Sequence, residues 1–376
     1  MSTRKKIWSS SWRVLLCIVL LGWIFHTIFL KEARSNLGPK LWDTYSYSEQ
    51  ARAAWIHGPP KLWSTLTLIS PGALALSVIL MGLTILLGIA RWRMVLRVHG
   101  LELSWSRTAE ISFVAHFFNS FLLGSTGGDL MKAYYAARET HHKKTEAVVT
   151  VFVDRLVGLW AMLLFAGLMM LPQSNLALLF VHSHLRSLAA LILAMLAACS
   201  GVVAVAFWGG VSRGWSGARE WLRRLPKGEW LERSLESCRT FGRERLFVSR
   251  TLGFSMVLNA VCVLQVLVLA WGLHLDIPPL VLFVTVPMII CISALPITPS
   301  GLGVRENLFV FMLAQSSIGV PATTALSLSL LAYAGSLFWS LVGGLVYAMF
   351  KERHHLKEAE LEQSETGVLG TIDAAR

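Results

Sequence analysis

The feature that most constrains the fold of this chain is a series of apolar runs, each close to the length of a bilayer. A helix needs roughly 20 mostly apolar residues to cross the hydrocarbon core. Hydrophobic residues make up 55% of the chain and charged residues only 15%, whereas soluble domains carry about 25% charged residues. We therefore predict an all-α, polytopic membrane protein. Spanning helices are expected at six places: 14–30, 72–90, 148–171, 187–209, 251–273 and 321–350.

The first of these runs follows a basic N-terminus, as the apolar part of a signal peptide would. Its apolar core is long, and no clear small-x-small cleavage site follows it. We expect it to remain as an uncleaved transmembrane anchor. The chain then divides into an anchor with an external loop, a membrane domain and a polar tail, at residues 1–71, 72–350 and 351–376.

Basic residues predict how the spans are oriented. Lys and Arg flank the apolar runs on one side, whereas segments 172–185 and 274–279 contain neither. Because cytoplasmic loops are enriched in Lys and Arg, we expect both termini in the cytoplasm. The basic loop at 31–71 is an exception to this rule. Loop 210–250 combines ten basic residues with tryptophans, which indicates either an amphipathic helix on an anionic leaflet or a solvated loop.

Two further apolar regions, 109–136 and 279–319, are interrupted by glycine or by proline and glycine. The charges place both ends of the first region in the cytoplasm and both ends of the second outside, so each must return to its starting side. The first is too short for two full spans and a turn. We expect two re-entrant broken helices that enter from opposite faces, as in an inverted repeat. A helix–loop–helix at the membrane surface is the alternative.

The breaks themselves have the residues of an anion site. The first, "GSTGGDLMK", ends in Asp129 and Lys132, and the second, "PSGLGVRE", ends in Arg305 and Glu306. A half-helix that begins at a break presents unpaired N–H groups with partial positive charge. Glycine allows close approach to the backbone, and arginine can bind a phosphate through two parallel hydrogen bonds. At membrane depth, such backbone is tolerated only against protein or a water-filled cavity.

Two adjacent charges, Asp154 and Arg155, lie inside an otherwise apolar run. Neighbouring residues point about 100° apart on a helix, so we expect these two not to pair with each other. Arg155 could extend to the interface, whereas Asp154 needs a partner, because an ionised group is expensive within a span. Lys132 and Arg305 are the candidate partners. His116 and Asn119 share a helix face, and we interpret them as helix–helix hydrogen-bonding residues rather than ligand contacts.

The ordered motifs "GGDLMKAYY", "VFVDRLVGL" and "LPITPSGLGVRE" resemble the flippase-like membrane domain of the lysylphosphatidylglycerol synthase family, over about residues 72–350. Where that family often has a proline before the first glycines, this chain has Leu123 and Gly124. The soluble aminoacyl-transferase domain of the full-length synthases has no counterpart here, so the resemblance implies lipid translocation and not aminoacylation. It marks ten candidate residues for headgroup binding and transport: Gly128, Asp129, Lys132, Asp154, Arg155, Pro299, Gly301, Gly303, Arg305 and Glu306.

These observations predict a lipid transporter or flippase in the bacterial inner membrane, which moves a polar headgroup, with an anionic one favoured. One alternative is a membrane-embedded transferase that uses Asp129, Asp154 or Glu306 as acid or base. Another is a non-catalytic scaffold of a lipid-synthesis complex. The expected partners are a phospholipid or other polar lipid and a lipid-synthesis enzyme, without nucleic acid. No ATP, zinc-protease or serine-hydrolase motif occurs, so we expect no cofactor and no metal.

Overall fold

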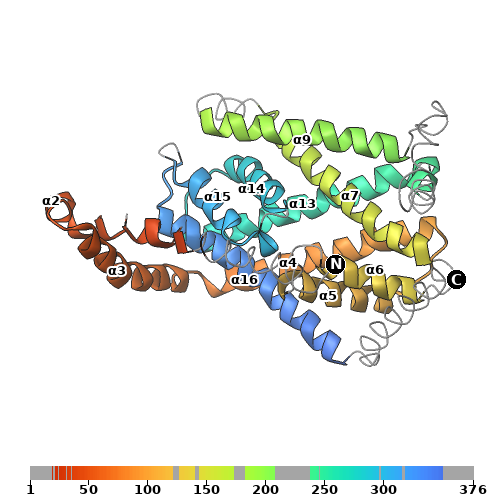
Figure 1. Ribbon diagram of the computed structural model, residues 1–376, viewed down its shortest axis with the longest axis horizontal. Helices are drawn as coiled ribbons and strands as arrows, with labels where there is room; N and C mark the ends of the chain where they lie inside the picture. Colours follow the sequence, from red (N-terminus) through yellow and green to blue (C-terminus); the bar gives the residue numbers. More distant parts are fainter. Residues whose placement is uncertain are drawn as a thin grey trace, which may run out of the picture.

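The computed structural model is a bundle of α-helices (Figure 1). No strand occurs in the residues that it describes, which confirms the all-α prediction. Those residues are 19, 22–23, 25–30, 32–34, 36–121, 127–139, 144–172, 183–207, 238–244, 246–295, 298–315 and 318–349.

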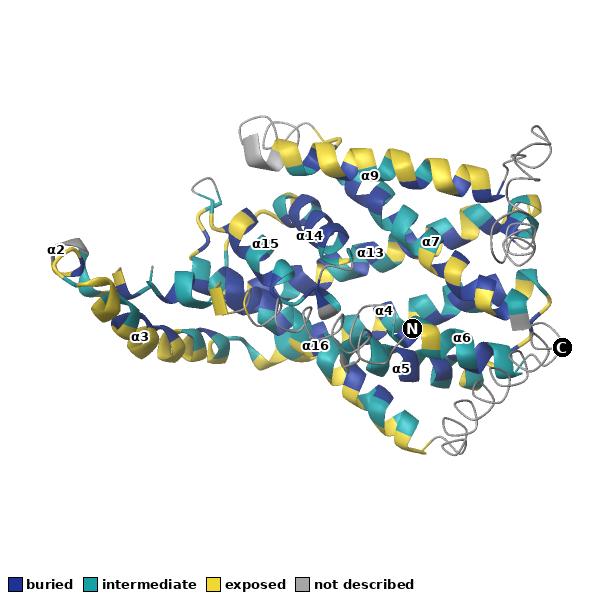
Figure 2. Ribbon diagram, viewed as in Figure 1, coloured by how far each residue is buried: buried dark blue, intermediate teal, exposed yellow. Residues whose placement is uncertain are grey.

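Five of the helices are long and apolar enough to cross a membrane. The chain is therefore a multi-pass membrane protein, as predicted. Figure 2 shows that the outer helix of the bundle, α9, carries an exposed face, and leucine and valine side chains such as Leu191 and Val202 lie on it. Of the sixth predicted span, 14–30, the structure describes residues 19, 22–23 and 25–30, and these are helical. The five helices are α4 (Pro71–Val98), α7 (Lys144–Met169), α9 (Ser183–Phe207), α13 (Phe247–Gly272) and α16 (Ala322–Met349).

Helix α4 is longer than predicted. It begins at a proline after Ser70, whose hydroxyl accepts a hydrogen bond from the Ala73 N–H at 3.4 Å, an arrangement typical of helix starts. It then continues past residue 90, because Trp92 and Leu96 are fully buried and extend the apolar face by two turns. The predicted end at residue 90 is therefore wrong. As a result, Arg91 lies within the helix and not in a flanking loop.

The segment expected as an external loop, 31–71, contains two helices, α2 (Pro39–Trp42) and α3 (Tyr47–Thr67). They extend away from the bundle in Figure 1. At the start of α3, the Glu49 carboxylate accepts a hydrogen bond from the Ser46 N–H at 2.8 Å. A Ser-x-x-Glu sequence is a signal for a helix start, whereas Pro59 and Pro60 inside the helix oppose a helical interpretation.

The two interrupted regions form helical pairs. The first is α5 (Trp105–Phe121) with α6 (Gly127–Glu139), and the second is α14 (Pro279–Ser293) with α15 (Val304–Leu313). At 1.5 Å per residue, even the longer member of each pair spans only about 22–25 Å, less than the hydrocarbon core of about 30 Å. In Figure 1 the two pairs lie toward opposite ends of the bundle. This arrangement suits two re-entrant hairpins; their entry sides remain a prediction.

Candidate functional site

Asp154 lies at the meeting point of three helices. Its Oδ1 accepts a hydrogen bond from Arg91 Nε at 2.9 Å, and its Oδ2 accepts one from Lys132 Nζ at 3.3 Å. The Asp154 side chain is 8% exposed and those of Arg91 and Lys132 are each 12% exposed. We call these three residues the buried charge cluster. It joins α7, α4 and α6, and it holds two cations for one carboxylate.

Neighbouring residues fix both cations in place. Arg91 Nη1 donates a hydrogen bond to Ser255 Oγ of α13 at 3.1 Å. The same guanidinium packs on Gly158, where a Cβ would lie 2.9 Å from its nitrogens. Lys132 Nζ lies 4.1 Å from the centroid of the Trp92 ring, a favourable cation–π contact. The cluster is therefore held by contacts on several sides, and not only by its own ion pairs.

A second ion pair joins α6 to α7. Arg155 Nε lies 2.5 Å from Asp129 Oδ2, and the Arg155 side chain is about half exposed. Asp129 and Lys132 are three residues apart on α6, so they share a face. On that face, Asp129 pairs with Arg155 and Lys132 pairs with Asp154. As predicted, Asp154 and Arg155 do not pair with each other.

The backbone of the second break needs glycine. It contains a short 3-10 turn, η1 (Pro299–Gly301), and ends where α15 begins. Ser300, Gly301 and Gly303 have φ values of 53°, 70° and 82°, in the left-handed region that favours glycine. A Cβ on Gly301 would lie 2.8 Å from the carbonyl oxygen of Ser293. The break is thus a tightly packed turn.

The charges after this break form a pair of their own. Glu306 is fully buried, and its Oε2 accepts a hydrogen bond from the Gly303 N–H at 2.6 Å. Its Oε1 accepts hydrogen bonds from the Arg305 guanidinium, which lies 4.4 Å from the centroid of the Tyr333 ring. Lys132 is therefore a partner of Asp154, as predicted. The other predicted partner, Arg305, is not, because the adjacent carboxylate of Glu306 binds its guanidinium.

Asn119, near the end of α5, connects the two breaks. Its Oδ1 accepts a hydrogen bond from the Gly128 N–H at 2.9 Å, and its carbonyl oxygen accepts one from Ser300 Oγ at 2.8 Å. The approach at Gly128 leaves no room for a side chain, since a Cβ would lie 1.9 Å from the Ala115 carbonyl oxygen. The Asn119 side chain thus makes a helix–helix hydrogen bond, as interpreted from the sequence. Its backbone carbonyl in addition joins segments 181 residues apart.

His116 fits that interpretation, because its Nε2 lies 3.2 Å from the Ser336 carbonyl oxygen of α16. Together, these contacts place the three motifs in one region. Ser300 contacts Asn119, Asn119 contacts Gly128, and α6 leads from Gly128 to the buried charge cluster.

Three buried polar atoms beside these groups have no hydrogen-bond partner within the described ranges: Trp92 Nε1, Ser293 Oγ and Thr298 Oγ1. Trp92 adjoins the buried charge cluster, and the two hydroxyls flank the second break. A buried polar group without a partner costs roughly 1–3 kcal/mol, so water or a polar ligand would stabilise these positions. A cluster of His, Cys, Asp and Glu that could hold a metal ion is absent from the part of the chain that the structure describes.

Arg91 is the functional residue that the sequence interpretation missed. Because it directly follows the predicted span 72–90, the sequence interpretation treats it as one of the basic residues that flank a span. The available signal was the apolar pattern that follows it, Trp92, Val95 and Leu96, all fully buried. Spacings of three and four residues indicate that the helix continues, and a continuing helix places Arg91 inside it.

Known sequences match this region of the chain. A family model described as the lysylphosphatidylglycerol synthase TM region matches residues 51–344. A protein from Methanothermobacter thermautotrophicus, named a UPF0104 membrane protein, is 25% identical over 315 residues, which cover 74% of this chain and 84% of the relative. The ten candidate residues and Arg91 all lie within the range that the family model matches.

Proposed function

The chain belongs to the lysylphosphatidylglycerol synthase transmembrane-region family, and on this premise we propose that it is a flippase, which moves a lipid with an anionic headgroup between leaflets. The observation that carries this proposal is the excess of positive charge in the buried charge cluster. Arg91 and Lys132 face a single carboxylate, that of Asp154. Ionisable groups inside a span mark transport pathways in many membrane proteins, and a surplus cation there favours a phosphate group.

The two breaks supply the remaining contacts in this proposal. Headgroup oxygens would accept hydrogen bonds from N–H groups at the start of α6, beside Gly128, and from the hydroxyl groups of the second break. The acyl chains stay in the lipid while the headgroup passes between the hairpins. Because Ser300 and Asn119 close the gap between the hairpins in this state, passage requires that this contact open.

The proposal includes an orientation of the protein in the membrane. We place it in the cytoplasmic (inner) membrane of a bacterium with both termini in the cytoplasm, since Lys and Arg concentrate on that side of the spans. The α5–α6 hairpin then enters from the cytoplasm and the α14–α15 hairpin from outside. We expect a phospholipid as the transported partner.

Leaflet exchange in liposomes tests the proposal. The purified protein is reconstituted with fluorescent phosphatidylglycerol, and a membrane-impermeant quencher measures the fraction of label in the outer leaflet over time. We expect the wild-type protein to accelerate exchange over protein-free liposomes, and the Asp154→Asn variant not to. Exchange at the protein-free rate would contradict the proposal. Chemical conversion of the headgroup, read by mass spectrometry of the same lipids, would select a transferase instead.

A further inference from the structure

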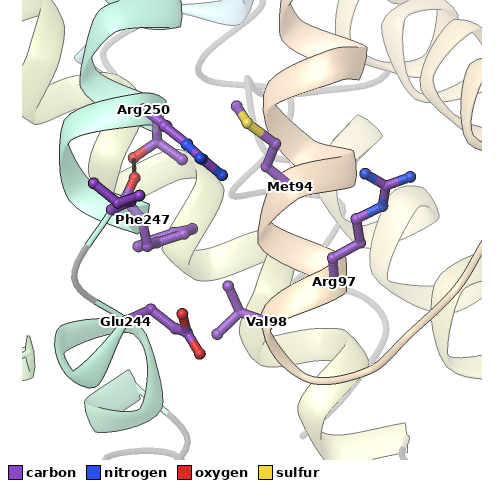
Figure 3. Close-up of a pocket in the computed structure, with 8 residues that line it drawn as sticks. Met94, Arg97, Val98, Glu244, Phe247 and Arg250 are labelled. Carbon is purple, nitrogen blue, oxygen red and sulfur yellow. Dashed lines mark hydrogen bonds between the residues drawn. The ribbon is translucent and has the colours of Figure 1, made fainter.

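A cavity of about 280 Å³ lies between the C-terminal end of α4 and the N-terminal end of α13 (Figure 3). It is separate from the ten candidate residues and from the buried charge cluster. Eight residues line it: three are charged, four are apolar and one is a threonine. The lining residues are Met94, Arg97, Val98, Glu244, Leu246, Phe247, Arg250 and Thr251.

The charged side chains of this cavity have no charged or hydrogen-bonding partner among the described residues. Arg97, Arg250 and Glu244 make no ion pair and no side-chain hydrogen bond with any residue that the structure describes. In Figure 3, Arg250 extends from α13 toward Met94 and the Glu244 carboxylate points toward Val98, whereas the Arg97 guanidinium lies on the side of α4 away from Arg250. Guanidinium groups match the geometry of phosphate oxygens, and a carboxylate matches an ammonium group. The N-terminal end of α13 adds partial positive charge.

The other walls of the cavity are apolar. Met94 and Val98 come from α4, and Leu246 and Phe247 from the start of α13. Small-molecule sites usually measure about 300–1,000 Å³, so this cavity has room for a headgroup and not for a whole lipid. An amphiphile with a short apolar stem below a charged end fits both the walls and the size.

The two helices that line the cavity, α4 and α13, lead from it to the buried charge cluster. On α13, Thr251 lies one turn before Ser255, and the Ser255 hydroxyl accepts a hydrogen bond from Arg91. On α4, Met94 is three residues from Arg91, and Arg97 is six residues away, about 9 Å along the axis. A headgroup in the cavity would therefore be about two helical turns from the cluster.

We propose that this cavity binds a phospholipid headgroup that carries both a phosphodiester and a primary amine. Arg250 binds the phosphate oxygens, and Glu244 binds the ammonium group. The location in the cytoplasmic leaflet rests on the orientation of the flippase proposed above. The binding itself does not depend on transport.

Binding of a short-chain lipid to the purified full-length protein tests this inference. Dihexanoyl phosphatidylethanolamine is the probe, and its affinity is measured by calorimetric titration in detergent. We expect Arg250→Gln to weaken binding by about tenfold, the effect of one lost charge-assisted contact. Arg52→Gln, at an exposed position of α3, makes the same change in charge away from the cavity and should bind the probe as the wild type does.

Two further probes identify the ligand chemistry. Dihexanoyl phosphatidylglycerol, which lacks the amine, should bind more weakly than the ethanolamine lipid, and Glu244→Gln should abolish this difference. Inorganic phosphate should not displace the lipid at equal concentration. Displacement by phosphate would show a site for soluble anions and overturn the assignment to a lipid.

The Asp154→Asn variant separates this inference from the proposed function, because it should bind the probe with wild-type affinity even where leaflet exchange is lost. Unchanged affinity in Arg250→Gln would overturn the inference, whatever the transport assay gives. A fluorescence measurement of thermal unfolding on each variant checks that the fold is retained. If Arg250→Gln were unfolded, Arg250→Met, which keeps the apolar stem and removes the charge, would replace it, and with this variant, too, unchanged affinity would count against the inference.

Discussion

Asp154 is held by cations from two other helices, and this arrangement predicts strong coupling between the residues. Asp154→Asn leaves Arg91 and Lys132 buried without a counter-charge, so we expect a loss of stability of about 3–5 kcal/mol. Removing Lys132 as well, in Asp154→Asn/Lys132→Gln, should restore part of it, with a coupling of about 0.5–3 kcal/mol. Reversible unfolding of the purified variants in mixed micelles measures both values.

A matched control for this cycle exists on the same pair of helices. The ion pair of Asp129 with Arg155 is about half exposed on the arginine side, and exposed pairs contribute about 1 kcal/mol or less. Asp129→Asn should therefore cost far less stability than Asp154→Asn. Strict additivity in the Asp154–Lys132 cycle would show that these two residues do not interact, and Arg91 alone would then balance the charge of Asp154.

Arg305 tests whether shape or charge matters at the second break. Its guanidinium contacts Glu306 and the face of Tyr333, and a lysine would retain the charge but lose the planar fork. We expect Arg305→Lys to lower the rate of leaflet exchange by about tenfold, as the loss of a charge-assisted contact would. If Arg305→Lys were fully active and Arg305→Ala inactive, the charge alone would be needed.

Only one of the two cations that bind Asp154 could be predicted from the sequence, for a physical reason. Lys132 was predictable as a partner of Asp154 because both are ionisable groups near membrane depth that need compensation. Arg91 was not, since an arginine at the apparent edge of a span is usually an interfacial residue. The distinction depends on where the helix ends, and that is the least certain feature of a sequence pattern.

The α5–α6 hairpin depends on one close approach, at Gly128. A Cβ there would lie 1.9 Å from the Ala115 carbonyl oxygen, so Gly128→Ala must push the two helices apart. We expect a loss of stability of about 1–3 kcal/mol, the usual range for overpacking. Gly201→Ala on α9 is the control, because nothing lies within 4 Å of its added Cβ, and it should be neutral or stabilising by up to about 1 kcal/mol.

Thermal unfolding in detergent compares the two glycine variants. Equal midpoints would show that the approach at Gly128 relaxes without cost.

The two helical pairs could be predicted from charge and from the Gly-rich breaks, because both constrain how far a chain can travel in a bilayer. Helix α3 did not follow, since its only clear signal, Ser46 with Glu49, is opposed by two prolines within the helix.

The whole molecule brings two segments that are far apart in sequence to one point. The hydrogen bond from Ser300 to Asn119 joins the tip of the second break to the end of α5. No helix of either pair is long enough to cross the membrane alone, and their contact brings Ser300, Asn119 and Gly128 into one hydrogen-bonded set. Sequence motifs identified both ends of this set. They could not show that the ends meet, because the contact is made by a backbone carbonyl group.

The proposed topology predicts opposite accessibility at the two breaks. Each break is given one cysteine, Ser125→Cys or Ser300→Cys, in a chain whose five native cysteines are replaced by alanine. Ser125 lies outside the described residues, in the link between α5 and α6. If the hairpins enter from opposite faces, a membrane-impermeant maleimide should label residue 125 from the cytoplasmic side and residue 300 from outside. Labelling of intact cells and of inverted vesicles measures both, and labelling of both positions from one side would rule out the inverted arrangement.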